Sequence, residues 1–70
     1  MNNLFKEVLE TTGYICEPTK ENVVNCFLDY VSEGAFANLN SDEALRDIED
    51  GDITIEQICN NLLRICNRNL

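Results

Sequence analysis

Three glycines set the strongest constraint on how this chain folds. Gly13, Gly34 and Gly51 each follow directly on a run in which apolar residues recur every three or four positions. This spacing is typical of amphipathic helices, and glycine is favoured in the left-handed position just past a helix end. The glycines therefore predict an all-α fold in which the chain divides into four short helices.

Each of the first two predicted helices has one apolar side. The first covers residues 3–12, with Leu4, Phe5, Val8 and Leu9 on one face. Pro18 and Thr19 open the second, which runs through Glu33, and Thr19 is its expected N-cap. Its apolar side consists of Val23, Val24, Phe27, Leu28, Tyr30 and Val31. The stretch between the two helices, residues 14–18, is a connector.

The last two predicted helices differ sharply in character. The third follows Asn40 or Ser41, has a capping-box spacing between Asn40 and Glu43, and is mostly charged. Its apolar stripe is thin and consists of Ala44, Leu45 and Ile48. The fourth, residues 55–70, has a broad apolar side made of Ile55, Ile58, Cys59, Leu62, Leu63, Ile65, Cys66 and Leu70. We expect the fourth helix to be the centre of the core.

The length of the chain limits the size of that core. A domain of 70 residues buries only about 60% of the surface that it exposes when unfolded. Hydrophobic residues make up 44% of the chain, which is typical of globular proteins. We therefore predict one small domain over residues 1–70, a bundle or array of four short helices, in which self-association is one way to cover leftover apolar surface.

The charge of the chain favours one class of partner. Thirteen acidic and five basic residues give a net charge of −8 without any histidine. Direct binding to nucleic acid is electrostatically disfavoured, whereas basic protein surfaces are favoured. No apolar run reaches the ~20 residues of a membrane span, and residues 1–16 lack the features of a secretory signal. We expect a soluble, cytoplasmic protein that does not bind membranes.

The stretch around Gly51 resembles half of a calcium-binding loop. With Gly51 at the sixth position of an EF-hand, the first position would be Arg46 and the third Ile48. These side chains supply no oxygen ligand, so the sequence predicts no metal here. Local helix-end motifs explain the stretch better. Gly51 stops the third helix, Thr54 and Gln57 have the spacing of a capping box, and Ile53 and Ile58 that of a hydrophobic staple.

The four cysteines lack the spacing of a zinc site. The pairs Cys16–Cys26 and Cys59–Cys66 are too far apart for a Cys-x2-4-Cys motif, and no histidine is present. Cys59 and Cys66 fall on an apolar helix face, where we expect core packing. Cys26 falls at the edge of an apolar side, so partial exposure is expected. Cys16 lies in the connector, where the sequence leaves a pairing with another cysteine open.

Three further functions find little support in the sequence. A helix-turn-helix over residues 44–63 would need basic side chains to bind DNA, and this region is acidic. Acyl carrier proteins are also small and acidic, but neither Ser32 nor Ser41 lies in their Gly-x-Asp-Ser-Leu attachment motif. No nucleophile–base pair points to an enzyme. We predict neither catalysis nor a cofactor.

The acidic segment, residues 42–56, is the feature that helix formation does not explain. It holds seven of the thirteen acids, namely Asp42, Glu43, Asp47, Glu49, Asp50, Asp52 and Glu56. Those near the end of the third helix oppose its dipole, at a cost of a few tenths to about 1 kcal/mol each. One explanation is a solvated face that maintains solubility. The other is a binding surface for a basic partner, formed by these seven residues.

The short, asparagine-rich, acidic chain resembles phage-encoded antidefence proteins, anti-CRISPR proteins among them, and small immunity proteins in composition. This resemblance implies a non-enzymatic protein that binds a larger macromolecule and inhibits or regulates it. A row of carboxylates could imitate the charges of a nucleic-acid strand in the partner's basic channel. The alternative function is a structural or assembly module that self-associates through apolar surface.

Overall fold

The computed structural model describes residues 2–36 and 39–68 of the chain. All the regular secondary structure in this part is helical: α1 (Asn2–Thr12), α2 (Lys20–Ser32), α3 (Ser41–Asp50) and α4 (Ile55–Arg68). The all-α class and the four short helices are therefore confirmed. Leu70, which we predicted on the apolar side of the fourth helix, lies outside the described residues.

The first three helices end at the glycines that the sequence indicated. Gly13, Gly34 and Gly51 have φ angles of 84°, 83° and 84°, in the left-handed region. The amide that follows each glycine donates to the carbonyl five residues earlier, at 2.9, 3.0 and 2.8 Å respectively. This bond closes the last helical turn and reverses the chain. Each helix is thus terminated by a local backbone motif that needs no tertiary contact.

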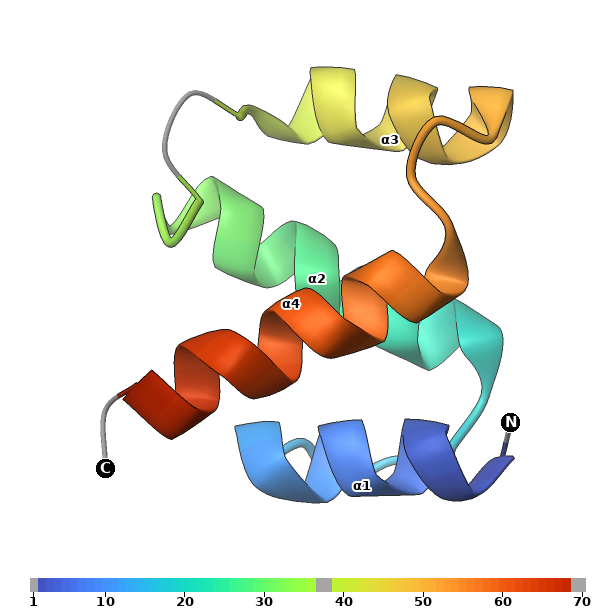
Figure 1. Ribbon diagram of the computed structural model, residues 1–70, viewed down its shortest axis with the longest axis vertical. Helices are drawn as coiled ribbons and strands as arrows, with labels where there is room; N and C mark the ends of the chain where they lie inside the picture. The colour runs from blue at the N-terminus through green and yellow to red at the C-terminus, as the bar shows by residue number, and fades with distance from the viewer. Residues whose placement is uncertain (1, 37–38, 69–70) are drawn as a thin grey trace.

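The helices are arranged with α1 and α3 at opposite ends of the molecule and α2 and α4 between them (Figure 1). Helix α4 packs against α1 and α2. Helix α2 packs against all three other helices, and the main packing contact of α3 is with α2. The prediction that the fourth helix is the centre of the core therefore needs a correction, because α2 shares that position.

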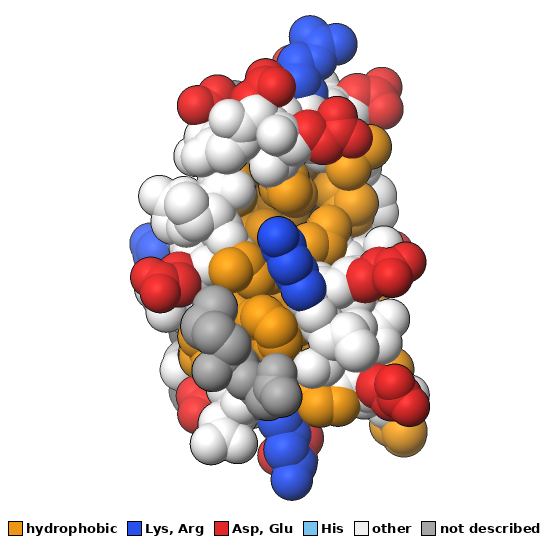
Figure 2. Space-filling model, turned by 90° about the vertical axis from the view of Figure 1, so that its right-hand side faces the viewer, with side chains coloured by type: hydrophobic (Ala, Val, Ile, Leu, Met, Phe, Trp, Pro, Cys, Tyr) orange, Lys and Arg blue, Asp and Glu red, His pale blue; other side chains and the backbone are white. Residues whose placement is uncertain are grey.

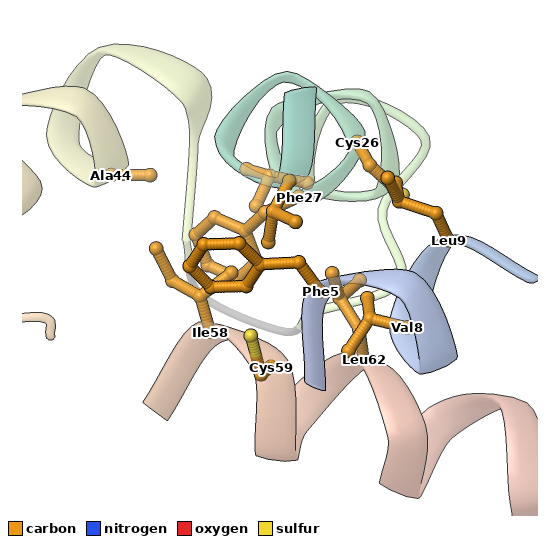
Figure 3. Packing of buried hydrophobic residues seen from close by; sticks show 11 residues of the cluster. Phe5, Val8, Leu9, Cys26, Phe27, Ala44, Ile58, Cys59 and Leu62 are labelled. Atoms are coloured by element: carbon orange, nitrogen blue, oxygen red, sulfur yellow. The ribbon is translucent and has the colours of Figure 1, made fainter. Parts of the chain in front are cut away.

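The core is a cluster of apolar side chains from all four helices, and no polar or charged residue in the described part is buried. Figure 3 shows its members from α1, α2 and α4 pointing into the space between these helices. The buried residues are Phe5, Val8, Leu9, Val23, Cys26, Phe27, Val31, Ala44, Ile58, Cys59 and Leu62. Fully burying a valine, leucine, isoleucine or phenylalanine side chain contributes about 1.5–3 kcal/mol.

Helix α3 joins this core weakly. Its one buried residue is Ala44, which lies at the margin of the cluster in Figure 3. The segment before the helix adds Phe36 and Leu39, both half-buried against the core. The ring centroids of Phe27 and Phe36 are 5.1 Å apart with the planes tilted by 53°, a favourable aromatic arrangement. The fold thus holds α3 by a narrow contact and leaves most of its surface to solvent.

Candidate partner-binding surface

The turn between α3 and α4 is built from backbone hydrogen bonds rather than from carboxylates. The carbonyl of Asp47 accepts from the amides of Asp52 and Ile53, at 2.8 and 3.1 Å. The carboxylates of Asp50 and Asp52 form no hydrogen bond in this turn. Gly51 acts as a helix stop, as predicted. Within residues 2–36 and 39–68, no three His, Cys, Asp or Glu side chains come together in a way that could hold a metal ion.

A capping box begins α4, as the sequence predicted, whereas at α3 only one of the two bonds of a capping box forms. At α4, the Thr54 amide donates to Oε1 of Gln57 at 2.9 Å, and the Gln57 amide donates to Oγ1 of Thr54 at 3.2 Å. At α3, the Glu43 amide donates to Oδ1 of Asn40 at 2.8 Å. The return bond runs from Nδ2 of Asn40 to Oε1 of Glu43 at 3.1 Å, so it uses the Asn side chain. Glu43 therefore has a local structural role.

Four of the predicted site residues surround one cation on the outer face of α3. Asp42 and Glu43 precede Arg46 by four and three residues, and Glu49 and Asp50 follow it by three and four. Side chains at these intervals are neighbours on a helix, with Cβ atoms about 5–6 Å apart. All five side chains are exposed. The outer face of α3 is therefore a strongly negative surface with a single positive charge in its middle.

The other three predicted site residues lie nearer to α4. Asp47 is half-buried, Asp52 is exposed in the turn, and Glu56 is exposed in the first turn of α4. As far as the structure describes the chain, no carboxylate of the acidic segment forms an ion pair. Figure 2 shows acidic side chains over the α3 end of the molecule and along both sides of an apolar area. The structure thus places six of the seven residues on α3 and the turn that follows it, and Glu56 in the first turn of α4.

An apolar groove lies beside these carboxylates, where α2 begins and where α3 runs into α4. Its volume is about 260 Å³, and we call it the isoleucine groove. It is lined by Lys20, Val24, Ile48, Gly51, Ile53, Thr54, Ile55 and Ile58. Sequence reasoning missed this groove because it assigned the isoleucines to the core or to the staple. A usable signal was present, namely the three isoleucines that lie within eight residues of each other among acids.

A second groove lies at the other end of the fold, between α1 and the connector to α2. Its volume is about 710 Å³, and we call it the Ile15 groove. It is lined by Lys6, Leu9, Glu10, Gly13, Tyr14, Ile15, Cys16 and Pro18. The side chain of Ile15 is 102% exposed, as fully as in an extended peptide. The sequence identified this stretch only as a connector, and the adjacent apolar residues Tyr14 and Ile15 were the available signal.

The cysteines are free thiols in environments that range from buried to exposed. Our prediction that Cys26 is partly exposed was wrong, because α1 covers it: its side chain is fully buried, with Sγ 3.6 Å from Oγ1 of Thr12. Burial raises the pKa of the Cys26 and Cys59 thiols. Cys66 is half-buried, and Cys16 is exposed and unpaired with any other cysteine.

Two tyrosines connect separate parts of the fold through their hydroxyl groups. Tyr14 donates to Oδ2 of Asp29 at 2.7 Å, which fastens the connector to α2. This hydrogen bond, together with burial, raises the pKa of Tyr14 well above its ordinary value. The hydroxyl of Tyr30 lies 3.6 Å from Sγ of Cys66, between α2 and α4. This contact and burial raise the pKa of Tyr30 to about 12.

Comparisons with known proteins add no family to this picture. No protein-family model matches the chain, and neither a curated protein nor a solved structure matches it significantly. In the described ranges, none of the helices is both long enough and apolar enough to cross a membrane. The surface of the molecule itself is therefore the basis for a functional proposal.

Proposed function

We propose that this protein is a non-enzymatic binder that attaches to a larger protein with a basic surface and inhibits or regulates it. The acidic segment is the contact surface. The observation that carries the proposal is that its seven carboxylates have no ion-pair partner in the described part of the chain, and all but Asp47 are exposed. Glu49 and Asp50 oppose the dipole of the helix in which they lie, so they reduce stability without serving the turn.

The charge pattern fits a partner that normally holds a nucleic acid. Glu43, Asp47 and Asp50, at four- and three-residue intervals, give α3 a line of negative charges along one side. A positively charged channel attracts such a line by the same electrostatic complementarity that attracts phosphates. Phage antidefence proteins such as anti-CRISPR inhibitors, which the chain resembles in composition, are the corresponding functional class.

The test is a charge reversal within the acidic segment. The partner is captured from the native host, and its affinity for the double variant Asp47→Lys with Asp50→Lys is measured at low and high salt. We expect binding to be lost while the circular-dichroism helix signal remains, and binding by the unchanged protein to weaken as salt rises. The matched control is Glu7→Lys with Glu10→Lys, which makes the same charge change on the exposed side of α1. Unchanged affinity in the Asp47–Asp50 variant would overturn the proposal.

Self-association is a second candidate function, and the full exposure of Ile15 favours it. An isoleucine that projects into water beside a 710 Å³ apolar groove gives a second copy of the chain something to cover. Light scattering that shows a stable monomer at high concentration would rule this function out. A dimer that dissociates in the variant Ile15→Asn would support it.

A further inference from the structure

The isoleucine groove leaves apolar surface exposed at the acidic end of the molecule. Ile58 is fully buried at its base, whereas Ile48, Ile53 and Ile55 are only half-buried on its walls. An engineered protein cavity of about 150 Å³ holds a benzene molecule. A groove of about 260 Å³ therefore has room for one leucine or phenylalanine side chain of a partner.

Exposed carboxylates are next to three of the wall residues in the sequence. Glu49 follows Ile48, Asp52 precedes Ile53, and Glu56 follows Ile55 in the sequence, and all three carboxylates are exposed. Figure 2 shows an apolar area with acidic side chains on both sides. A partner with only a basic channel would contact the carboxylates and leave the apolar area exposed to water. An apolar side chain with cations on either side would satisfy both features.

One cation of the chain itself competes for this position. Lys20 is the charged residue among those that line the groove, and it is exposed at the first position of α2. Lysine side chains lay their methylene groups over apolar surface and keep the ammonium group in water. In Figure 2 a basic side chain crosses the apolar area. A partner that docks here must displace Lys20 or place its own cations away from it.

We propose that the isoleucine groove receives a single large apolar side chain of the partner, flanked in the partner by lysine or arginine residues. This inference rests on the proposed function and specifies the chemistry of its partner: an amphipathic basic segment of a protein. Its basis is the charge complementarity between such a segment and the acidic border of an apolar groove. The apolar side chain supplies affinity and position, and the flanking cations supply attraction and orientation.

The first experiment compares two synthetic peptides. One has about 12 residues, roughly three helical turns, and carries a single leucine flanked by lysines; the second replaces that leucine with alanine. Binding to the full-length protein is followed by NMR of isoleucine, leucine and valine methyl groups. We expect the leucine peptide to bind at least about tenfold more tightly and to shift the methyl signals of Ile48, Ile53 and Ile55.

Each result of the peptide comparison has a defined meaning. Equal affinity of the two peptides would overturn the groove inference, while the proposed charge-based binding would stand. Absence of binding by either peptide would overturn both. A leucine peptide whose affinity is unchanged by Asp47→Lys with Asp50→Lys would count against the proposed function and leave the groove in place.

Three variants locate the contact on the protein. Lys20→Ala is expected to increase affinity for the leucine peptide several-fold, because it removes a competing cation from an exposed site. Ile53→Asn is expected to reduce it about tenfold, with circular dichroism as the folding check. The matched control, Ile15→Asn, changes the other groove and should leave the affinity unaltered. The inference would be overturned if Ile15→Asn lowered the affinity for the leucine peptide and Lys20→Ala left it unchanged. This outcome can be read even if Ile53→Asn fails to fold.

Discussion

Helices α2 and α3 are of similar length, 13 and 10 residues, but they differ in how they are held. Helix α2 buries Val23, Cys26, Phe27 and Val31 and packs against all three other helices. Helix α3 buries only Ala44. Its remaining surface carries four exposed carboxylates around Arg46. One helix is positioned by its own apolar side, and the other by its caps and by a narrow contact.

This difference separates the part that stabilises the fold from the part available for binding. A domain of this size has a total stability of only several kcal/mol, so large apolar side chains in the core account for much of it. Helix α3 can carry mutually repelling charges because little of the core depends on it.

The largest contrast is expected between two leucines. Leu62 in α4 is 0% exposed, and Leu45 in α3 is 43% exposed. We expect Leu62→Ala to lower the free energy of unfolding by about 2–5 kcal/mol, because it leaves a cavity in the core. Leu45→Ala should cost less than about 1 kcal/mol, since its side chain already contacts water. Urea denaturation of both variants measures the difference, and similar losses would remove the distinction between the two regions.

The second prediction compares the glycines that end the two helices. An added Cβ at Gly34 or Gly51 would meet no atom within 4 Å, so the φ angles of 83° and 84° are the whole obstacle. We expect alanine at either position to cost about 1–2 kcal/mol. Thermal unfolding checks both variants. If only Gly34→Ala lowers the midpoint temperature of the main unfolding transition, α3 unfolds separately from the rest of the molecule.

The third prediction uses pH to test the contact between α2 and α4. The pKa of Tyr30 is about 12 in the fold against an ordinary 10.0, first because of its contact with Cys66 and then because of burial. The folded state therefore holds this proton more tightly, so the stabilisation is complete below pH 10.0 and is lost as the pH rises toward 12. Tyr30→Phe should cost at most about 1 kcal/mol at neutral pH.

The measurement is the free energy of unfolding as a function of pH. We expect Tyr30→Phe to flatten the decline above pH 10.0. The Cys26 and Cys59 thiols, whose pKa values are also raised, keep their part of the decline in both proteins. An unchanged slope in Tyr30→Phe would show that the contact between Tyr30 and Cys66 does not contribute.

The smallest predicted effect concerns the two ends of α3, where removing a carboxylate should change the free energy of unfolding in opposite directions. Asp42 lies in the first turn of this helix and Asp50 is its last residue. Asp50→Asn should raise the free energy of unfolding by a few tenths of a kcal/mol, because it removes a negative charge from the negative end of the dipole. Asp42→Asn should lower it by a similar amount. Equal effects of the same sign would mean that general charge repulsion outweighs the dipole.

The sequence predicted the ends of the helices well because these depend on neighbouring residues. The stop at Gly51 and the capping box of Thr54 and Gln57 form within a few residues of one another. The exposure of the acidic segment was also predictable, since charged side chains on a short amphipathic helix face water. These features need only the local geometry of a helix and its two ends.

The environment of Cys26 and the isoleucine groove could not be obtained in this way. A helical projection placed Cys26 at the edge of an apolar side, and the presence of Thr12 from α1 on that edge is a matter of packing. The groove takes residues from α2, α3, α4 and the turn. Its existence depends on the angle at which these elements meet.

The sequence alone determined four helices, their ends, and an acidic third helix with too few apolar residues to bury itself. Helix propensity, capping and charge are properties of nearby residues, so they can be derived from the order of the chain. The tertiary structure decided which helix holds the others, which cysteine is covered, and that half-buried isoleucines lie among the carboxylates. These features arise from side chains that are distant in sequence, and only the packing of the helices brings them together.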